Sequence, residues 1–331
     1  MGGLRKVVVT PPTFDGAALD YLRAHGCEPV LPETPEAQFT PEEWPALLAG
    51  ADGWIIGPAP HVTRDLVAAL PACRVVARRG VGYERLDTNA IAEAGRVAAI
   101  ATGGNDASVA DAAVGLMLAV GRRMREQQNA MLSGDWSIRV STDLYRMTVG
   151  IIGMGRSGRA LAQRLRGFES KLLAVTPRPD LAWGETAGVA FTDLAALLRE
   201  SDYVSIHAPL TPATRRLIGA AELAAMKPGA ILINTARGGL VDDRALLETL
   251  RSGHLGGAGL DVFEGESDPA LKPIAQELLA LPNVVATPHS AASTRQGLAR
   301  TNMIIARAVV AVLDGTQPPE GCVIADGRRS L

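Results

Sequence analysis

A glycine-rich turn in the middle of the chain constrains the fold more than any other feature of the sequence. The segment GMGRSG follows the apolar run TVGII and opens the helical pattern RSGRALAQRLRGF. In such a strand–turn–helix unit the glycines permit a tight turn, close approach of a pyrophosphate, and close packing of helix on strand. The N–H groups and dipole at the helix N-terminus attract phosphate. The turn is predicted to bind a dinucleotide, with a merely flexible turn as the alternative, through Gly153, Met154, Gly155, Arg156, Ser157 and Gly158.

Short β-branched runs alternate with longer stretches rich in Ala, Leu and Arg, which is the pattern of βαβ units around a parallel sheet. Continuous apolar runs such as AILIN are typical of strands covered by helices on both faces. The sequence therefore predicts an α/β fold. Strands are expected at residues 6–10, 53–57, 74–78, 97–100, 148–153, 171–176, 203–208, 230–234, 257–262 and 283–286.

Two long helical patterns divide the chain into domains. One covers residues 108–132, with Ser108 as N-cap and Asp111 three residues later, and the other covers residues 294–313. We expect a Rossmann-type, doubly wound dinucleotide-binding domain at residues 104–290. A second, smaller flavodoxin-like α/β domain for the substrate is expected to combine residues 1–103 with residues 291–331.

Composition argues against several classes of function. The chain has 33 basic and 35 acidic residues, so it lacks the positive field that attracts nucleic acid. Its three cysteines lie far apart and its five histidines form no HxxH or HxxxH pair, so neither disulfides nor a metal site are expected. No apolar run approaches the roughly 18 residues that a membrane span needs. We expect a cytoplasmic protein without membrane or nucleic-acid partners.

The strand after the glycine turn bears on the choice of dinucleotide. NAD-binding units carry an Asp or Glu about 20 residues beyond the glycines, for the adenosine ribose. Here the strand KLLAVT ends in Thr176, and Arg178 follows in the loop. A hydroxyl and a guanidinium suit a 2′-phosphate, so NADP(H) is expected to be favoured over NAD(H). In the alternative, Arg178 is a solvated loop residue, and Asp180 or no side chain serves the ribose.

Three polar residues follow apolar strands in the second half of the chain: Arg237 in INTARGG, Glu266 in VFEGES and His289 in ATPHSAA. The carboxyl ends of parallel strands meet at the sheet edge where such folds bind ligands. A guanidinium can bind a carboxylate, an imidazole can pass a proton near neutral pH, and a carboxylate can orient the imidazole. The set suits a 2-hydroxy or 2-keto acid beside a nicotinamide. Taken singly, each residue has a structural alternative: Arg237 as a salt-bridge partner, Glu266 as a solvated side chain and His289 as a capping residue.

From residue 76 onward the sequence resembles the D-isomer-specific 2-hydroxyacid dehydrogenases, through ARRGVGYERLD, GGNDASVADAAVGLML, TVGIIGMGRSGR, DYVSIHAPLTPATRRLIG, MKPGAILINTARGGLVDDRALLETL, GLDVFEGE and NVVATPHSAAST. The resemblance implies hydride transfer between NAD(P)(H) and C2 of a small 2-hydroxy acid, with catalytic roles for Arg237, Glu266 and His289. It also implies that Asp261 contacts the nicotinamide end, and that Val81 and Gly82 meet the substrate carboxylate. Further cofactor contacts are implied for Ala208, Pro209, Thr214, Thr235, Ala236, Arg237 and His289.

The resemblance leaves the substrate open. Arg78 falls where similar phosphoglycerate dehydrogenases often carry an arginine for the substrate phosphate, so a phosphorylated acid is one hypothesis. The other is NADPH-dependent reduction of glyoxylate or hydroxypyruvate, with Arg78 an exposed cation or a partner of Glu84. Related corepressors use the same scaffold for protein contacts without turnover, which is the alternative of another class. The apolar helix at residues 108–132 resembles the element through which the family dimerises, so a homodimer is expected.

Overall fold

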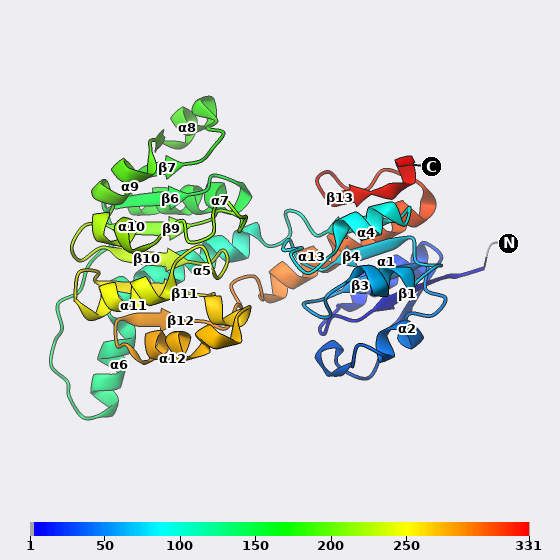
Figure 1. Ribbon diagram of the computed structural model, residues 1–331. Coiled ribbons are helices and arrows are strands. Elements are labelled where there is room, and N and C mark those ends of the chain that lie inside the picture. Colours follow the sequence, from blue (N-terminus) through cyan, green and yellow to red (C-terminus); the bar gives the residue numbers. More distant parts are fainter. Residues whose placement is uncertain (1–2, 331) are drawn as a thin grey trace. The chain divides into compact units, whose positions relative to one another are not determined.

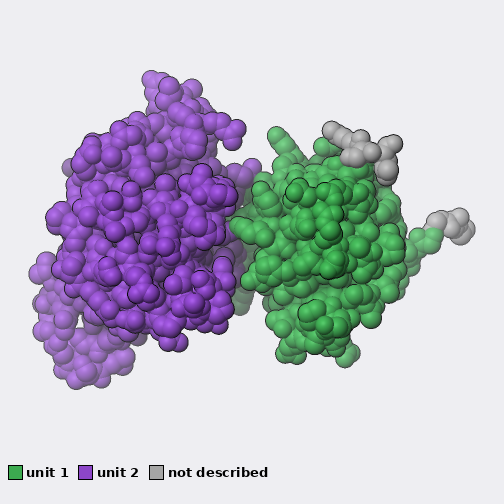
Figure 2. Space-filling view, in the orientation of Figure 1, with its two compact units in different colours: residues 1–105, 294–331 green, residues 106–293 purple. Residues whose placement is uncertain are grey.

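Two compact units, each with its own sheet and core, make up the chain. The computed structural model describes residues 3–330. One unit combines residues 1–105 with residues 294–331, and the other is continuous from residue 106 to residue 293 (Figure 2). Each contains a mostly or wholly parallel sheet between two layers of helices. The predicted α/β class is therefore confirmed.

The unit of residues 106–293 is built on a seven-stranded parallel sheet with the order β12-β11-β10-β9-β6-β7-β8 (Figure 1). The chain reverses its direction of winding between β6 and β9, which is the Rossmann-type switch point where such folds bind ligands. The strands are β6 (Thr148–Ile152), β7 (Lys171–Val175), β8 (Val189–Phe191), β9 (Tyr203–Ile206), β10 (Ile231–Asn234), β11 (Gly257–Leu260) and β12 (Val284–Ala286). The helices are α5 (Asp106–Gly121), α6 (Met124–Leu132), α7 (Arg156–Leu165), α8 (Leu181–Ala187), α9 (Leu194–Glu200), α10 (Ala220–Ala225), α11 (Asp243–Arg251) and α12 (Lys272–Ala280). Short 3₁₀ turns are η2 (Arg166–Phe168), η3 (Glu264–Glu266) and η4 (Pro269–Leu271).

Alternate residues of these strands point to opposite faces, so each face of the sheet has its own buried layer. Ile152 and Leu232 pack with the helices α9 to α12. Their neighbours Ile151 and Ile233 pack on the other face with α5 and α7. Because helices cover both faces, the strand ends remain as the places where polar side chains can meet a ligand.

The unit formed by the two chain ends is built on a six-stranded sheet with the order β13-β5-β4-β3-β1-β2. Its five parallel strands follow the flavodoxin-like order 2-1-3-4-5, and β13 pairs antiparallel with β5. Helices α1 and α13 pack on one face, and α2, α3 and α4 on the other (Figure 1). The strands are β1 (Arg5–Val9), β2 (Cys27–Val30), β3 (Gly53–Ile56), β4 (Val75–Arg78), β5 (Val97–Ile100) and β13 (Val323–Asp326). The helices are α1 (Gly16–Ala24), α2 (Glu43–Leu47), α3 (Arg64–Ala68), α4 (Thr88–Glu93) and α13 (Arg295–Asp314), with 3₁₀ turns η1 (Glu36–Gln38) and η5 (Gly327–Ser330).

The prediction of one continuous helix over residues 108–132 is wrong. The helix starts earlier, with Ser108 inside its first turns rather than at the N-cap, and it breaks after Gly121. At the break the backbone N–H of Thr142 donates to the carbonyl of Gly121 at 2.8 Å, and Arg123 takes a left-handed conformation with φ +50°. Asp111 does not complete a capping box, because its carboxylate pairs with Arg164.

Within residues 3–330, no helix combines the length and the apolar character that crossing a bilayer requires. In the same part of the chain, no cluster of three or more His, Cys, Asp or Glu side chains is arranged to hold a metal ion.

Candidate active site

The glycine turn joins the carboxyl end of β6 to the start of α7. Gly153 has φ +97°, and a Cβ there would lie 2.7 Å from the backbone nitrogen of Ala208. A Cβ on Gly158 would lie 2.2 Å from the carbonyl oxygen of Gly153, so α7 packs directly on the turn. At Gly155, in contrast, a Cβ would meet no atom within 4 Å. The middle glycine therefore faces open space. The protein's own packing would tolerate a side chain there, so the space that Gly155 leaves is available to a ligand.

This open start of α7 fits a dinucleotide pyrophosphate. Gly155 is the N-cap and supplies no side-chain acceptor, and the first turn of α7 contains no acidic residue. The N–H groups of that turn are therefore available to a phosphate. Arg156 lies beside them and pairs with Asp106, with Nε 2.7 Å from Oδ2.

The buried side chain of His207 contacts the glycine turn through Ser157. Nδ1 of His207 lies 3.2 Å from the hydroxyl of Ser157, and Nε2 lies 3.0 Å from the hydroxyl of Ser205. Burial lowers the pKa of His207 to about 4, so the imidazole is neutral near pH 7. The sequence analysis did not select His207, whose only signal was its place directly after β9.

The residues expected at the adenosine ribose lie after β7. Thr176 is half-buried, and Arg178 is exposed, with no side-chain ion pair or hydrogen bond within residues 3–330. Asp180 caps α8 by accepting from the N–H of Trp183, and it pairs with Arg159 at 2.9 Å. These two contacts lower the pKa of Asp180, the capping hydrogen bond having the larger effect. Asp180, the alternative partner for the ribose, is thus already engaged, whereas Arg178 is not.

The remaining residues expected at the cofactor follow β9 and β10. Ala208 is half-buried and Pro209 is exposed, and the carbonyl of Pro209 accepts from the Thr214 hydroxyl at 2.6 Å. Thr235 is buried directly after β10, and the N–H of Ala236 donates to Oδ1 of Asn234 at 3.1 Å. All of them lie on loops at the carboxyl edge of the sheet that carries the glycine turn.

His289 and Glu266 form a direct contact at the same edge. Nδ1 of His289 lies 2.7 Å from Oε2 of Glu266, and Oε1 of Glu266 accepts from the N–H of Phe263 at 2.7 Å. Burial raises the pKa of Glu266, but the hydrogen bonds from His289 and Phe263 and the charges of His289 and Arg237 outweigh it, so the pKa lies below its ordinary value. Glu266 is therefore an anion that fixes one ring nitrogen of His289 and leaves Nε2 for other contacts.

Asp261 holds the loop on which His289 stands. Its carboxylate is buried; Oδ1 accepts from the N–H of Ser290 at 2.8 Å, and Oδ2 accepts from that of Ala291 at 2.9 Å. The backbone carbonyl of Asp261 accepts from the N–H of His289 at 2.8 Å. His289 has φ +51°, an unfavourable conformation for a residue with a side chain, and such strain is found preferentially at functional sites. The contact with the nicotinamide end that the resemblance implies for Asp261 stays a prediction.

Arg237 lies in the loop after β10. The side chain of Asn234 brackets this loop, since Nδ2 donates to the carbonyl of Arg237 at 3.0 Å and Oδ1 accepts from the N–H of Ala236. One guanidinium nitrogen of Arg237 donates to the carbonyl of Ala236 at 2.7 Å. Arg237, Glu266 and His289 thus come from the loops after three adjacent strands, β10, β11 and β12.

The residues expected to bind substrate in the other unit lie at the end of β4 and in the loop that follows it. The guanidinium of Arg78 donates to the carbonyl of Gly57, and that of Arg79 donates to the hydroxyl of Thr13 at 3.2 Å. Val81 and Gly82 follow in a half-exposed loop, and their backbone N–H groups donate to no acceptor within the described residues. Their proposed contact with a substrate carboxylate remains a prediction.

Comparisons with known proteins agree on one family. A family model described as "D-isomer specific 2-hydroxyacid dehydrogenase, NAD binding domain" matches residues 114–291. The chain is 37% identical over 265 residues to a hydroxypyruvate reductase of Thermotoga maritima, and the match covers 79% of the chain and 85% of that protein. It is 34% identical over 317 residues to a D-3-phosphoglycerate dehydrogenase of Methanocaldococcus jannaschii, with 94% of the chain and 58% of that protein covered. The chain thus spans little more than half the length of this second relative.

A solved structure extends the similarity to both units. The crystal structure of D-lactate dehydrogenase from Aquifex aeolicus, complexed with NAD and lactic acid, matches with a TM-score of 0.82 and 27% sequence identity. The match covers 97% of the chain and 99% of that protein.

The anchoring of the His289 loop by Asp261 can be tested by substitution. Asp261→Asn introduces an NH₂ group that meets a backbone N–H whichever way the amide turns, Ser290 on one side and Ala291 on the other. We expect the free energy of unfolding in urea to fall by about 2 kcal/mol, with faster amide hydrogen exchange at residues 287–291. Asp193→Asn is the control, because Asp193 is an exposed N-cap of α9 and asparagine caps equally well. Equal, small effects of the two substitutions would contradict the anchoring role.

Proposed function

Because the chain belongs to the D-isomer specific 2-hydroxyacid dehydrogenase family, we propose that it interconverts a small 2-keto acid and its D-2-hydroxy acid with a nicotinamide dinucleotide. The observation that carries the proposal is the 2.7 Å contact between His289 and Glu266, beside Arg237, on the sheet that also bears the glycine turn. An acid–base group, its counter-charge and a cation for a carboxylate are what this reaction needs from a protein.

The open start of α7 supports a dinucleotide as cofactor. The turn from Gly153 to Gly158 would hold the pyrophosphate, and the loops of Ala208, Pro209, Thr214, Thr235 and Ala236 would flank the rest of the molecule. When bound, the nicotinamide supplies or accepts the hydride at C2 of the substrate.

Each catalytic side chain has a role that follows from its charge. Arg237 binds the substrate carboxylate and polarises the C2 oxygen. His289 gives a proton to that oxygen in the direction of reduction and takes it back in oxidation, through the ring nitrogen that Glu266 does not hold. Glu266 supplies the negative charge that stabilises the imidazolium and keeps the ring in one orientation.

The arginines after β4 favour an unphosphorylated substrate. The guanidinium groups of Arg78 and Arg79 already donate hydrogen bonds to a neighbouring carbonyl and a neighbouring hydroxyl group, respectively. We therefore place hydroxypyruvate or glyoxylate first. A phosphoglycerate is the second candidate, since Arg78 is only half-buried and a relative is named for that substrate.

The free guanidinium of Arg178 supports a preference for NADP(H). The residue that would repel a 2′-phosphate, Asp180, is paired with Arg159, and that arginine also stacks over the ring of Trp183 at 4.5 Å. An exposed arginine after β7 then meets the phosphate without a competing carboxylate.

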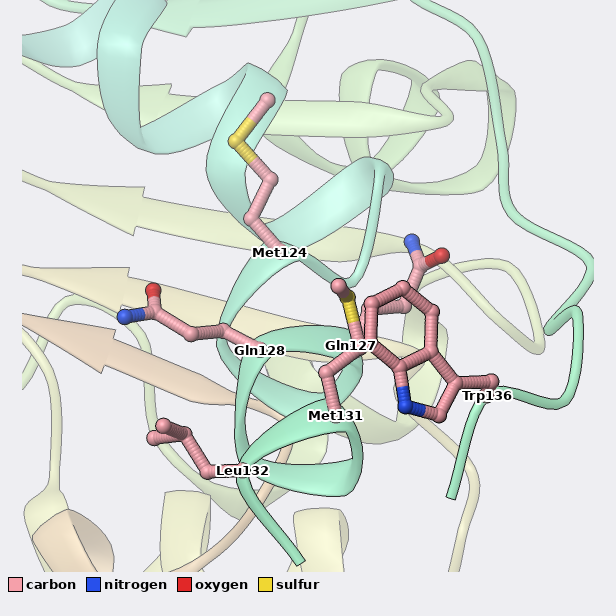
Figure 3. Close-up of a pocket in the computed structure, with 6 residues that line it drawn as sticks. All are labelled: Met124, Gln127, Gln128, Met131, Leu132 and Trp136. Carbon is pink, nitrogen blue, oxygen red and sulfur yellow. The ribbon is translucent and has the colours of Figure 1, made fainter. Parts of the chain in front are cut away.

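The α6 surface supports a homodimer. Five side chains of α6, together with Trp136 from the loop that follows, line a hollow of about 540 Å³, and the indole of Trp136 lies beside Met131 (Figure 3). In the same loop Trp136 is 75%, Ile138 95% and Val140 86% exposed. Large apolar side chains gathered in this way are typical of an interface rather than of a free surface.

A second copy of the chain is the occupant that fits. The loop offers apolar side chains that need cover, and the hollow on the adjoining helix is lined by methionines and leucine that could receive them. A two-fold axis brings the loop of each copy to the hollow of the other, because isologous contacts pair the same patch with itself. The helix is a firm base for such a contact, since Arg125 donates to the carbonyls of Leu279, Leu281 and Val284.

The proposed reaction is tested by turnover. The wild-type protein is expected to reduce hydroxypyruvate or glyoxylate with NADPH faster than it oxidises 3-phosphoglycerate, and His289→Gln is expected to lower kcat about 100-fold or more, the usual contribution of a general acid. His254→Gln is the control, because the imidazole of His254 contacts the carbonyl of Met226 and lies in the turn between α11 and β11. Nicotinamide absorbance at 340 nm measures the rates. A wild type inactive on all three acids, or an unimpaired His289→Gln, would refute the proposal.

The cofactor preference is tested at Arg178. Arg178→Ala is expected to raise KM for NADPH about tenfold, since a charge-assisted hydrogen bond contributes about 1.5–3 kcal/mol, and to leave KM for NADH unchanged. Arg199→Ala, at an exposed position on α9, is the matched control. Equal effects on both dinucleotides would rule out a 2′-phosphate contact.

The dimer is tested by light scattering at micromolar concentration. Trp136→Ala is expected to weaken association by about 30-fold, as loss of an interface tryptophan typically costs 2 kcal/mol or more. Leu181→Ala removes an equally exposed apolar side chain from α8 and should have no effect. A wild-type protein that stays monomeric at these concentrations would exclude this interface.

A further inference from the structure

Two acidic residues that the proposed chemistry does not use are buried together behind the catalytic loops. Asp243 begins α11 and Glu264 begins η3, and they are only 4% and 7% exposed. Each accepts a hydrogen bond from the backbone of the other: the N–H of Asp243 donates to Oε2 of Glu264 at 3.1 Å, and the N–H of Glu264 donates to Oδ2 of Asp243 at 2.8 Å. Capping does not account for Asp243, because the side chain of Asp242 already caps α11.

Among the described residues, one cation forms an ion pair with these two acids. Arg216, from the segment after β9, donates from Nε to Oε1 of Glu264 at 3.2 Å, and its Nη1 lies 3.5 Å from Oδ2 of Asp242. The other charged groups around Asp243 are the carboxylates of Glu264, Asp242 and Glu266. Burial, together with these negative charges, raises the pKa of Asp243 to about 7. The single guanidinium balances Glu264, so Asp243 retains its proton far above the ordinary range of an aspartate.

The pair joins the two loops that carry Arg237 and Glu266. Gly238 follows Arg237, and a Cβ there would lie only 2.1 Å from the carbonyl oxygen of Phe263, so the two backbones touch. Glu264 stands two residues before Glu266 in η3. Oε1 and Oε2 of Glu266 make separate short contacts, with Phe263 and His289, and a small rotation of η3 would break one of them.

We propose that Asp243, Glu264 and Arg216 form a clamp that positions Glu266 and Arg237. The inference rests on the proposed oxidoreductase function. The three are positioning residues, since they act through Glu266 and Arg237 rather than on the substrate. Loss of the proton from Asp243 places a second negative charge beside Glu264 and loosens the start of η3, so the clamp makes turnover depend on a second ionisation besides that of the acid–base histidine.

The test compares Asp243→Asn and Glu264→Gln with Asp202→Asn. Asp202 also accepts one backbone N–H, from Thr148 at 2.9 Å, and pairs with one cation, Lys227 at 2.9 Å, but it is more exposed than Glu264 and lies at the amino end of the same sheet. For each full-length variant, kcat and both KM values for keto-acid reduction are measured from pH 6 to pH 9, and the free energy of unfolding is measured from pH 4 to pH 9.

Glu264→Gln is expected to lower kcat about tenfold or more, because slight misplacement of catalytic groups costs this much or more, with KM for the dinucleotide within about twofold. Asp202→Asn should leave kcat unchanged. Asp243→Asn resembles the protonated acid, so kcat below pH 7 should stay within about twofold of wild type. Above pH 7, kcat of Asp243→Asn should begin to decline at a higher pH than kcat of the wild type does. A kcat of Glu264→Gln equal to that of Asp202→Asn, or an unshifted profile of Asp243→Asn, would overturn the clamp.

Stability gives a second readout that holds even where Glu264→Gln fails to fold. With its pKa raised to about 7, Asp243 binds a proton in the folded state that the unfolded chain has lost, so its contribution to stability falls as pH rises from about 4 to 7. Asp243→Asn should flatten this slope, and an unchanged slope would overturn protonation of Asp243. A wild type without turnover would refute the proposed function and the catalytic role of the clamp with it, whereas an active wild type with an unaffected Glu264→Gln refutes the clamp alone.

Discussion

Buried side-chain acceptors hold the loops at the carboxyl edge of the Rossmann-type sheet, and the arrangement of the site depends on them. Asn234 ends β10, and Asp261 and Glu264 follow β11. Asn234 and Asp261 accept backbone N–H groups of the loops that carry Arg237 and His289, and Glu264 accepts from the first residue of α11, where the Arg237 loop ends. An unsatisfied buried N–H costs about 1–3 kcal/mol. Because N–H groups of these loops donate to buried side-chain acceptors, each loop has one preferred backbone conformation. Its exposed catalytic side chain is therefore held in one preferred position.

Features set by local sequence could be predicted. The glycine turn after β6 was recognisable because much of what it requires is local: Gly153 has a positive φ, and Gly158 packs on the carbonyl of Gly153, between a strand and a helix that the sequence also indicates. The second long helix could also be predicted: the helical pattern covers residues 294–313, and α13 spans Arg295–Asp314. The ten expected strands all correspond to strands of the structure, because central strands of a covered sheet are apolar on both faces.

Features set by tertiary contacts could not be predicted from the sequence. The sequence analysis missed β2, β8 and β13, which lie at sheet edges and lack continuous apolar runs; β2 reads CEPV. The break after Gly121 depends on the N–H of Thr142, twenty-one residues away. Asp243 and Glu264 look like solvated acids in the sequence, since both precede helical turns. Only the fold shows that they are buried against each other.

The His289–Glu266 pair illustrates why these supports are needed. Both side chains remain accessible, at 51% and 38% exposure, as groups that exchange protons with a substrate must. An ion pair so exposed contributes at most about 1 kcal/mol, whereas a left-handed backbone at a residue with a side chain costs about 1–2 kcal/mol. The pair therefore cannot by itself keep His289 at φ +51°. The three hydrogen bonds that Asp261 accepts from residues 289–291 together outweigh the cost of this backbone conformation. The position of His289, which follows β12, is therefore fixed by a residue that follows the adjacent strand β11.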